Sequence, residues 1–165
     1  GLESRGLGDV YKRQLQSSSV WLVLFELSLR NKALDLLSRR EHSTSEIRKK
    51  LSRYESNSDV VKEVIKNLKT ENLLNDQRYA EAVVKEKSLK GYGPVHIENF
   101  LKKKGLTQYN SSIHELEIDW LEVCRSTFQK KSRNKDLSSK EKEKILRFLA
   151  YRGFSYEIIK SAISF

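Results

Sequence analysis

The sequence predicts an all-α protein, with three tandem three-helix repeats that form an elongated, curved molecule. Three observations lead to this prediction. The 165 residues include only seven glycines and one proline, while lysine, glutamate and leucine are abundant, which favours helices over strands. Apolar residues recur every three or four positions, as on the buried face of a helix. An isoleucine followed four residues later by a leucine returns at Ile47, Ile97 and Ile145, which lie 50 and 48 residues apart.

The first repeat is expected over residues 15–75, including an N-terminal extension. Its middle helix is predicted over residues 43–51, which bring Ile47 and the leucine after it onto one face. Ser43 and Glu46 have the spacing of a capping box, which satisfies the first free amide groups of a helix. The flanking helices are expected over residues 29–37 and 61–68, with Ser58 as the cap of the second.

The second repeat is expected over residues 76–118, with its middle helix within residues 93–106. Pro94 suits the first helical position, because a proline there loses no hydrogen bond that the helix needs. Gly105 suits the left-handed residue that ends a helix. The helix before it is expected to be capped by Asp76, and a weaker helical pattern follows around Ile113 and Leu116.

The third repeat is expected over residues 119–165, with its middle helix within residues 139–154 and Gly153 as its left-handed end. The helix before it is expected to be capped by Asp119, with Glu122 three residues later, and the helix after it by Ser155. Residues 130–139 are polar and lack periodicity, so we expect a flexible joint there.

Residues 1–14 are glycine-rich and lack helical periodicity, so we expect a non-native or disordered leader that does not contribute to the fold. The apolar stretch at residues 20–27 is too short to span a bilayer, and no small-residue cleavage site follows it. This stretch either extends the first helix or is foreign to the domain. We expect a cytoplasmic protein with no membrane association.

No arrangement of side chains in the sequence indicates catalysis. The three histidines are scattered without the spacing of metal ligands, and the glycines near Tyr92 lack the flanking strand of a phosphate-binding loop. Cys124, the single cysteine, lies among apolar residues at helical spacing, which favours a buried thiol over a nucleophile. We therefore expect a protein that is not an enzyme and needs no cofactor or metal.

The net charge of +10 favours a partner that is a polyanion or is associated with one. Lysines concentrate in the second repeat, where the segment from residue 85 to 104 has six basic and two acidic residues. They form either a cationic ridge that meets phosphates or an acidic partner, or a solvated helix face with lysines that balance helix dipoles. The candidate binding lysines are Lys85, Lys87, Lys90, Lys102, Lys103 and Lys104.

Three stretches resemble the RecX family, at residues 33–43, 73–106 and 152–159. The second is the most specific, with Leu-Leu-Asn-Asp-Gln-Arg-Tyr-Ala near its start and Lys-Gly-Tyr-Gly-Pro in its middle. The resemblance implies a fold of tandem three-helix repeats and a cytoplasmic bacterial protein of DNA repair, recombination and the SOS response. It also implies binding to the RecA filament on single-stranded DNA, with inhibition of the recombinase and ATPase activities of RecA as the usual effect.

The sequence departs from the family at the positions after the turn proline, which are usually basic and are here Val95 and His96. Direct phosphate contact by this helix start is therefore in doubt. His96 and Tyr92 remain candidate contact residues, although Tyr92 also suits packing between helices. Further candidates at the end of the first helix are Arg39 and Arg40.

Two other hypotheses remain open. Three short helices with a tight turn also describe helix-turn-helix modules, so the chain is alternatively a stand-alone, non-specific protein that binds single- or double-stranded DNA through phosphates. A purely structural helical scaffold would bind neither DNA nor RecA. In each case we expect a monomer without a small-molecule substrate. The sequence does not decide whether the protein inhibits or stimulates RecA. It also does not decide whether the protein binds in the groove of the filament or caps the filament end.

Overall fold

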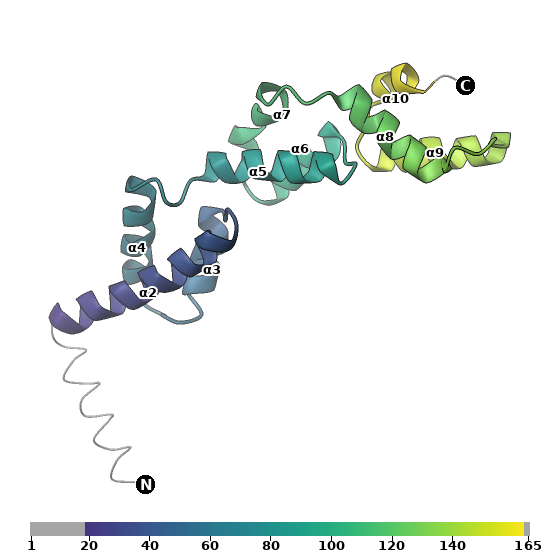
Figure 1. Ribbon diagram of the computed structural model, residues 1–165. Coiled ribbons are helices and arrows are strands. Elements are labelled where there is room, and N and C mark those ends of the chain that lie inside the picture. The colour runs from purple at the N-terminus through teal and green to yellow at the C-terminus, as the bar shows by residue number, and fades with distance from the viewer. Residues whose placement is uncertain (1–18, 164–165) are drawn as a thin grey trace, which may run out of the picture. The chain divides into compact units, whose positions relative to one another are not determined.

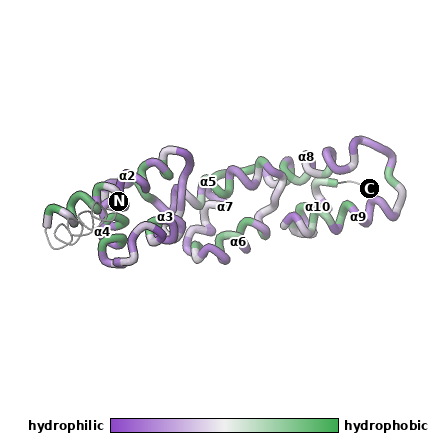
Figure 2. The backbone as a smooth tube through the Cα atoms, turned by 90° about the horizontal axis from the view of Figure 1, so that it is seen from below, coloured by the Kyte–Doolittle hydropathy of each residue, from purple (hydrophilic) through white to green (hydrophobic). Residues whose placement is uncertain are grey.

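The protein, analysed as a computed structural model, is described from residue 19 to residue 163, and the regular structure in this part of the chain is entirely helical (Figure 1). This part of the chain divides into two compact units, with the boundary between Asn75 and Asp76. The predicted leader at residues 1–14 lies outside the described residues. The all-helical prediction is confirmed for the part described, and apolar and polar residues alternate along its helices (Figure 2).

The first unit packs three helices around one core. They are α2 (Ser19–Arg39), α3 (Thr44–Leu51) and α4 (Ser58–Thr70). The core combines Leu29 and Ala33 of α2 with the Ile47–Leu51 pair of α3 and the apolar face of α4. The stretch at residues 20–27, whose role the sequence left open, extends α2. Its exposed apolar residues are Val20, Leu22, Val23, Leu24 and Leu27.

The second unit contains two further groups of helices, each with its own core. The first group consists of α5 (Asp76–Leu89), α6 (Pro94–Lys103) and α7 (Ser112–Glu115), with the short 3₁₀ helix η1 (Thr107–Tyr109) between the last two. Ile97 and Leu101 of α6 are fully buried in its core. The weak pattern predicted around Ile113 is thus a 3₁₀ turn and a single helical turn.

The second group consists of α8 (Trp120–Ser132), α9 (Ser139–Tyr151) and α10 (Tyr156–Ala162). Cys124, Ile145 and Leu149 are buried in its core. The predicted joint at residues 130–139 is shorter than expected, because α8 continues to Ser132 before it ends in a left-handed residue.

Helix caps follow the sequence closely, with two corrections. The side chains of Ser43, Asp119 and Ser155 each accept a hydrogen bond from the backbone amide three residues later, as predicted. The cap of α4 is Asn57 rather than Ser58, because the Asn57 carbonyl oxygen accepts from the amide of Asp59. Asp76 was predicted as a cap and is the first helical residue of α5.

A contact between two glycines joins the two groups of the second unit. The amide of Gly93 donates to the carbonyl of Arg152 at 2.8 Å, and the amide of Val95 donates to the carbonyl of Gly153 at 3.0 Å. A Cβ atom on Gly93 would lie 2.5 Å from the backbone of Gly153, and one on Gly153 would lie 2.3 Å from the backbone nitrogen of His96. The backbones therefore approach closely only because neither residue has a side chain.

Gly153→Ala is expected to destabilise the protein more than Gly105→Ala. Both glycines have positive φ, at +95° and +72°, so alanine is strained at either position by about 1 kcal/mol. At Gly153 the new methyl also overlaps the backbone of His96, whereas at Gly105 no atom lies within 4 Å. We expect a further loss of about 1–3 kcal/mol at Gly153, measured by urea unfolding followed by circular dichroism. Equal losses at the two positions would contradict the close contact.

The thiol of Cys124 is expected to resist modification in the folded protein. It is buried, and desolvation raises its pKa to about 11, so little thiolate forms at mildly alkaline pH. Reaction with a disulfide reagent such as DTNB should be slow until denaturant is added. The thiol introduced by Ser45→Cys, at an exposed position on α3, is the internal control and should react at once. Equal rates for the two thiols would show that Cys124 is accessible.

Candidate functional site

Aromatic and cationic side chains gather where the two helix groups of the second unit meet. Tyr92 stacks on the ring of His96, with centroids 4.2 Å apart. The guanidinium of Arg152 lies 4.3 Å from the centroid of Tyr92 and 5.0 Å from that of Phe148. A guanidinium over aromatic rings gains from their quadrupoles. We call the following residues the Tyr92 cluster: Lys87, Tyr92, His96, Phe100, Lys104, Phe148 and Arg152.

The lysines predicted to form a ridge fall into different environments. Lys87 is half-buried, with its ammonium 4.3 Å from the centroid of Phe100 and 5.0 Å from that of Tyr92. Lys104 lies 5.6 Å from the same Phe100 ring. These two cations are therefore held against aromatic rings.

The other candidate lysines face solvent. Lys90 forms an ion pair with Glu86 at 2.5 Å, and this hydrogen bond raises the pKa of Lys90. The exposed residues Lys85, Lys102 and Lys103 have no ion pair among the interactions found for residues 19–163. They are the candidate lysines with ammonium groups most available to an external anion.

His96 is surrounded by cations from three helices. Burial lowers its pKa first, and the charges of Lys87, Arg152 and Lys103 lower it further. Lys87 is on α5, Lys103 is on α6 with His96 itself, and Arg152 follows the end of α9, and each of these charges disfavours a proton on the ring. His96 therefore stays neutral at neutral pH, which suits its stacking on Tyr92.

Arg39 and Arg40 lie in the first unit, where each has a local partner. Arg39 pairs with Asp35 on its own helix at 2.9 Å, and both side chains are exposed. Arg40 pairs with Glu46 at 3.0 Å and also donates to the carbonyl of Glu41. The exposed Arg39–Asp35 pair stabilises the fold little, so an external anion can compete for Arg39, whereas the side chain of Glu46 beside Arg40 is only 18% exposed.

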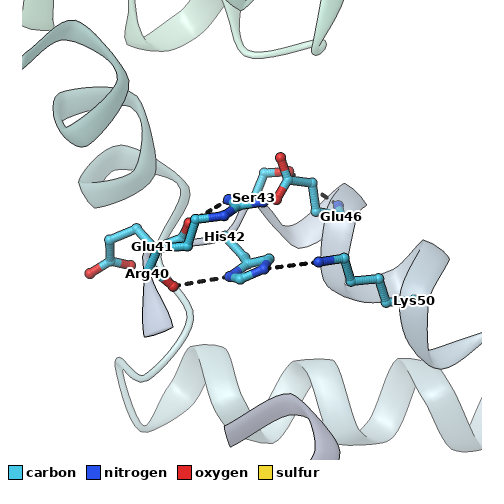
Figure 3. A network of polar contacts seen from close by, with 6 residues as sticks. All are labelled: Arg40, Glu41, His42, Ser43, Glu46 and Lys50. Carbon is cyan, nitrogen blue, oxygen red and sulfur yellow. Dashed lines mark hydrogen bonds and ion pairs between the residues drawn. The ribbon is translucent and has the colours of Figure 1, made fainter. Parts of the chain in front are cut away.

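His42 organises the turn between α2 and α3, a role that its sequence position did not reveal. Figure 3 shows its ring between the Arg40 carbonyl and the Lys50 ammonium, at 3.0 Å and 3.1 Å. A carbonyl only accepts and an ammonium only donates, so Nδ1 of His42 carries the proton and Nε2 accepts. The ring is thus neutral, and burial is the main cause of its lowered pKa.

Arg152 and the rings of Phe100 and Phe148 are the cluster members that sequence reasoning missed. Arg152 directly precedes Gly153, as Lys104 precedes Gly105, so the internal repeat was the signal that marked it. Its side chain also donates to the carbonyl of Lys90 at 3.0 Å, across 62 residues of sequence.

The described part of the chain offers little for metal chemistry. Among residues 19–163 no three histidine, cysteine or acidic side chains gather in a group that would hold a metal ion. None of the described helices has both the length and the hydropathy needed to cross a membrane.

Comparison with known families matches the chain to RecX three times, in order. The first, second and third three-helix domains of RecX match residues 30–68, 75–110 and 117–163. The chain belongs to the RecX family. The regulatory protein RecX of Pseudomonas entomophila strain L48 is 35% identical over 143 residues, which cover 84% of this chain and 91% of that protein. RecX of Ectopseudomonas mendocina strain ymp is 35% identical over 136 residues, covering 81% and 91%.

Solved RecX structures share the fold. The crystal structure of RecX from Lactobacillus salivarius superposes with a TM-score of 0.71 at 27% identity, and covers 85% of this chain and 95% of that one. A second crystal structure of regulatory protein RecX, at 21% identity and a TM-score of 0.68, supports the fold alone. The predicted fold class of three-helix repeats and the family resemblance are therefore confirmed.

The stability of this RecX-family chain is expected to fall as the pH drops below about 6.5, the ordinary pKa of histidine. His42 and His96 have lowered pKa values in the folded state, so the unfolded chain binds protons first. Their contribution to stability is complete above pH 6.5 and is lost as the pH falls through the folded pKa values. Thermal unfolding followed by circular dichroism at neutral and acidic pH measures the loss.

His42→Asn and His96→Asn are each expected to reduce this pH dependence, because asparagine does not titrate and can still donate a hydrogen bond from its amide. His114→Asn is the matched control, since His114 is exposed on α7. If the double variant at positions 42 and 96 lost as much stability in acid as the unmodified chain, other groups would account for the effect.

Proposed function

We propose that this chain binds the RecA filament on single-stranded DNA and lowers its ATPase and recombinase activities. It acts as a cytoplasmic monomer in DNA repair, recombination and the SOS response, and catalyses no reaction of its own. The observation that carries the proposal is the match of all three RecX domains in their order along the chain. The relatives that share this arrangement are named as regulatory proteins.

The second unit is the proposed contact surface for the filament. Its exposed lysines at the end of α6, Lys102 and Lys103, supply positive charge, and the charge of Lys103 acts on His96 of the Tyr92 cluster. The cluster adds aromatic rings and a stacked guanidinium, the residue types that contribute most to protein interfaces. In this proposal the rings anchor a protein partner, and the lysines steer the approach to a filament that also carries DNA phosphates.

Stand-alone binding to DNA remains the competing proposal. The net charge of +10 supports it, and such binding would depend on salt and not on base sequence. The two proposals differ in what they require. Regulation requires a change in a RecA activity at fixed DNA, whereas stand-alone binding requires only the DNA.

Titration of the chain into RecA-driven ATP hydrolysis on single-stranded DNA, at fixed salt, is the decisive measurement. We expect the rate to fall at or below stoichiometric amounts of the chain. Lys102→Glu with Lys103→Glu should raise the concentration for half-inhibition by roughly tenfold, because the reversed charges repel an acidic surface. Both side chains are exposed, so the fold should persist.

Lys66→Glu with Lys69→Glu is the matched control, with the same change of charge at exposed positions on α4. It should leave inhibition nearly unchanged. An unchanged ATPase rate at stoichiometric chain, together with salt-dependent binding to bare DNA, would favour the competing proposal. A rate that responds equally to both variants would mean that net charge, and not the second unit, governs the effect.

A further inference from the structure

The third helix group has a groove that its own helices do not cover. Helix α10 has only seven residues, against 13 in α9, and it packs mainly on α8. One flank of α9 is therefore left open. The groove beside it has a volume of about 610 Å³, within the range of small binding sites.

The floor of this groove is apolar, and the residues that line it on each side are spaced about one helical turn apart. Leu146 and Ala150 line it from α9, one turn apart, and Ile159 and Ile163 line it from α10 and its end. Because Ala150 has only a methyl side chain and is exposed, another chain can approach α9 closely there. A two-walled apolar channel of this kind accepts a third helix better than a flat ligand.

The rim of the groove is cationic. Arg147 lies on the α9 side and Lys160 on the α10 side, and none of the lining residues within the described range 19–163 is acidic. Arg147 also pairs with Glu143 on its own helix, while Lys160 has no ion-pair partner among residues 19–163. Tyr156, 76% exposed, completes the rim with an aromatic ring that has little contact with the rest of the fold.

We infer that this groove binds a short amphipathic helix of a protein partner, with aliphatic anchors on one face and carboxylates beside them. The aliphatic side chains fill the floor at i, i+3 and i+4 spacing, as in other complexes of a helix in a groove. Their flanking carboxylates meet Lys160 and Arg147 from opposite sides. The wall from residue 156 to 163 is about 10 Å long, which matches two turns of the bound helix.

Other occupants fit the groove less well. A nucleic acid would stack its bases on aromatic rings, and Tyr156 is the one ring that the described residues contribute to a groove whose floor is aliphatic. A second copy of this chain would bring more positive charge, because residues 119–165 have 11 basic and six acidic residues. An acidic, aliphatic protein segment satisfies both the floor and the rim.

The test is fluorescence anisotropy of the full chain with a fluorescein-labelled synthetic peptide of about 14 residues, with leucines at helical spacing and glutamates elsewhere. We expect saturable binding. A peptide with lysines in place of the glutamates should bind roughly tenfold more weakly, because the rim is cationic.

Two variants test whether the peptide binds in the groove. Ala150→Gln fills the floor at an exposed helical position, and Lys160→Glu reverses one side of the rim; each should weaken binding by roughly fivefold to tenfold. Lys140→Glu, at an exposed position of α9 outside the groove lining, is the matched control and should change binding by less than about twofold. Circular dichroism of each variant verifies the fold.

Three results would overturn the inference. The first is no binding of the acidic peptide, or binding to both groove variants as tight as to the unmodified chain. The second is displacement of the peptide by a single-stranded oligonucleotide whose own binding is abolished by Ala150→Gln. That result would assign the groove to nucleic acid. The third is a dimer in sedimentation that Ala150→Gln disrupts, which would assign it to a second copy. Neither RecA nor DNA is needed for peptide binding, so a failure here leaves the proposed function standing.

Discussion

The buried isoleucine–leucine pair on the middle helix of each repeat is the contact around which each core forms. Ile47 with Leu51 and Ile97 with Leu101 have no exposed surface, and the third pair, at residues 145 and 149, is almost as deeply buried. Two aliphatic side chains one turn apart give a short helix a single apolar face. The helices before and after it must pack on that face to bury it. A helix of 8–13 residues is marginal alone, so the flanking helices and the pair stabilise one another. This packing of two flanking helices on a central isoleucine–leucine pair occurs three times, with flanking helices of different lengths.

The second unit shows how a junction between repeats becomes a surface. The backbones at Gly93 and Gly153 are in contact, and this contact places the turn that carries Tyr92 beside the end of α9. Arg152 is thereby brought over the Tyr92 ring, while its hydrogen bond to the Lys90 carbonyl closes the other side of the turn. The aromatic rings hold the cations near the surface without neutralising them, unlike an ion pair such as that of Lys90 with Glu86.

Local rules predicted most of the fold, and the site much less. Ser43, Asp119 and Ser155 were predictable caps because each side chain serves an amide three residues away. Asn57 was missed in favour of Ser58 because both are good capping residues, and only the backbone conformation decides between them. Helical spacing put Lys87 on a face but not against Phe100, a contact that depends on how α6 packs on α5. Arg152 was missed because two of its partners, Tyr92 and the Lys90 carbonyl, lie 60 and 62 residues away in the sequence, and only the contact with Phe148 is local.

The glycine contact at the junction also governs which positions are free to vary. The repeats are joined there through two backbone hydrogen bonds, which persist whatever side chains the donating residues have, provided that the two glycines stay. The side chains of Val95 and His96 at the start of α6 take no part in these two bonds. The junction is thus held by main-chain atoms at two residues without side chains, and a substitution beside them changes the chemistry of the surface while both bonds stay in place.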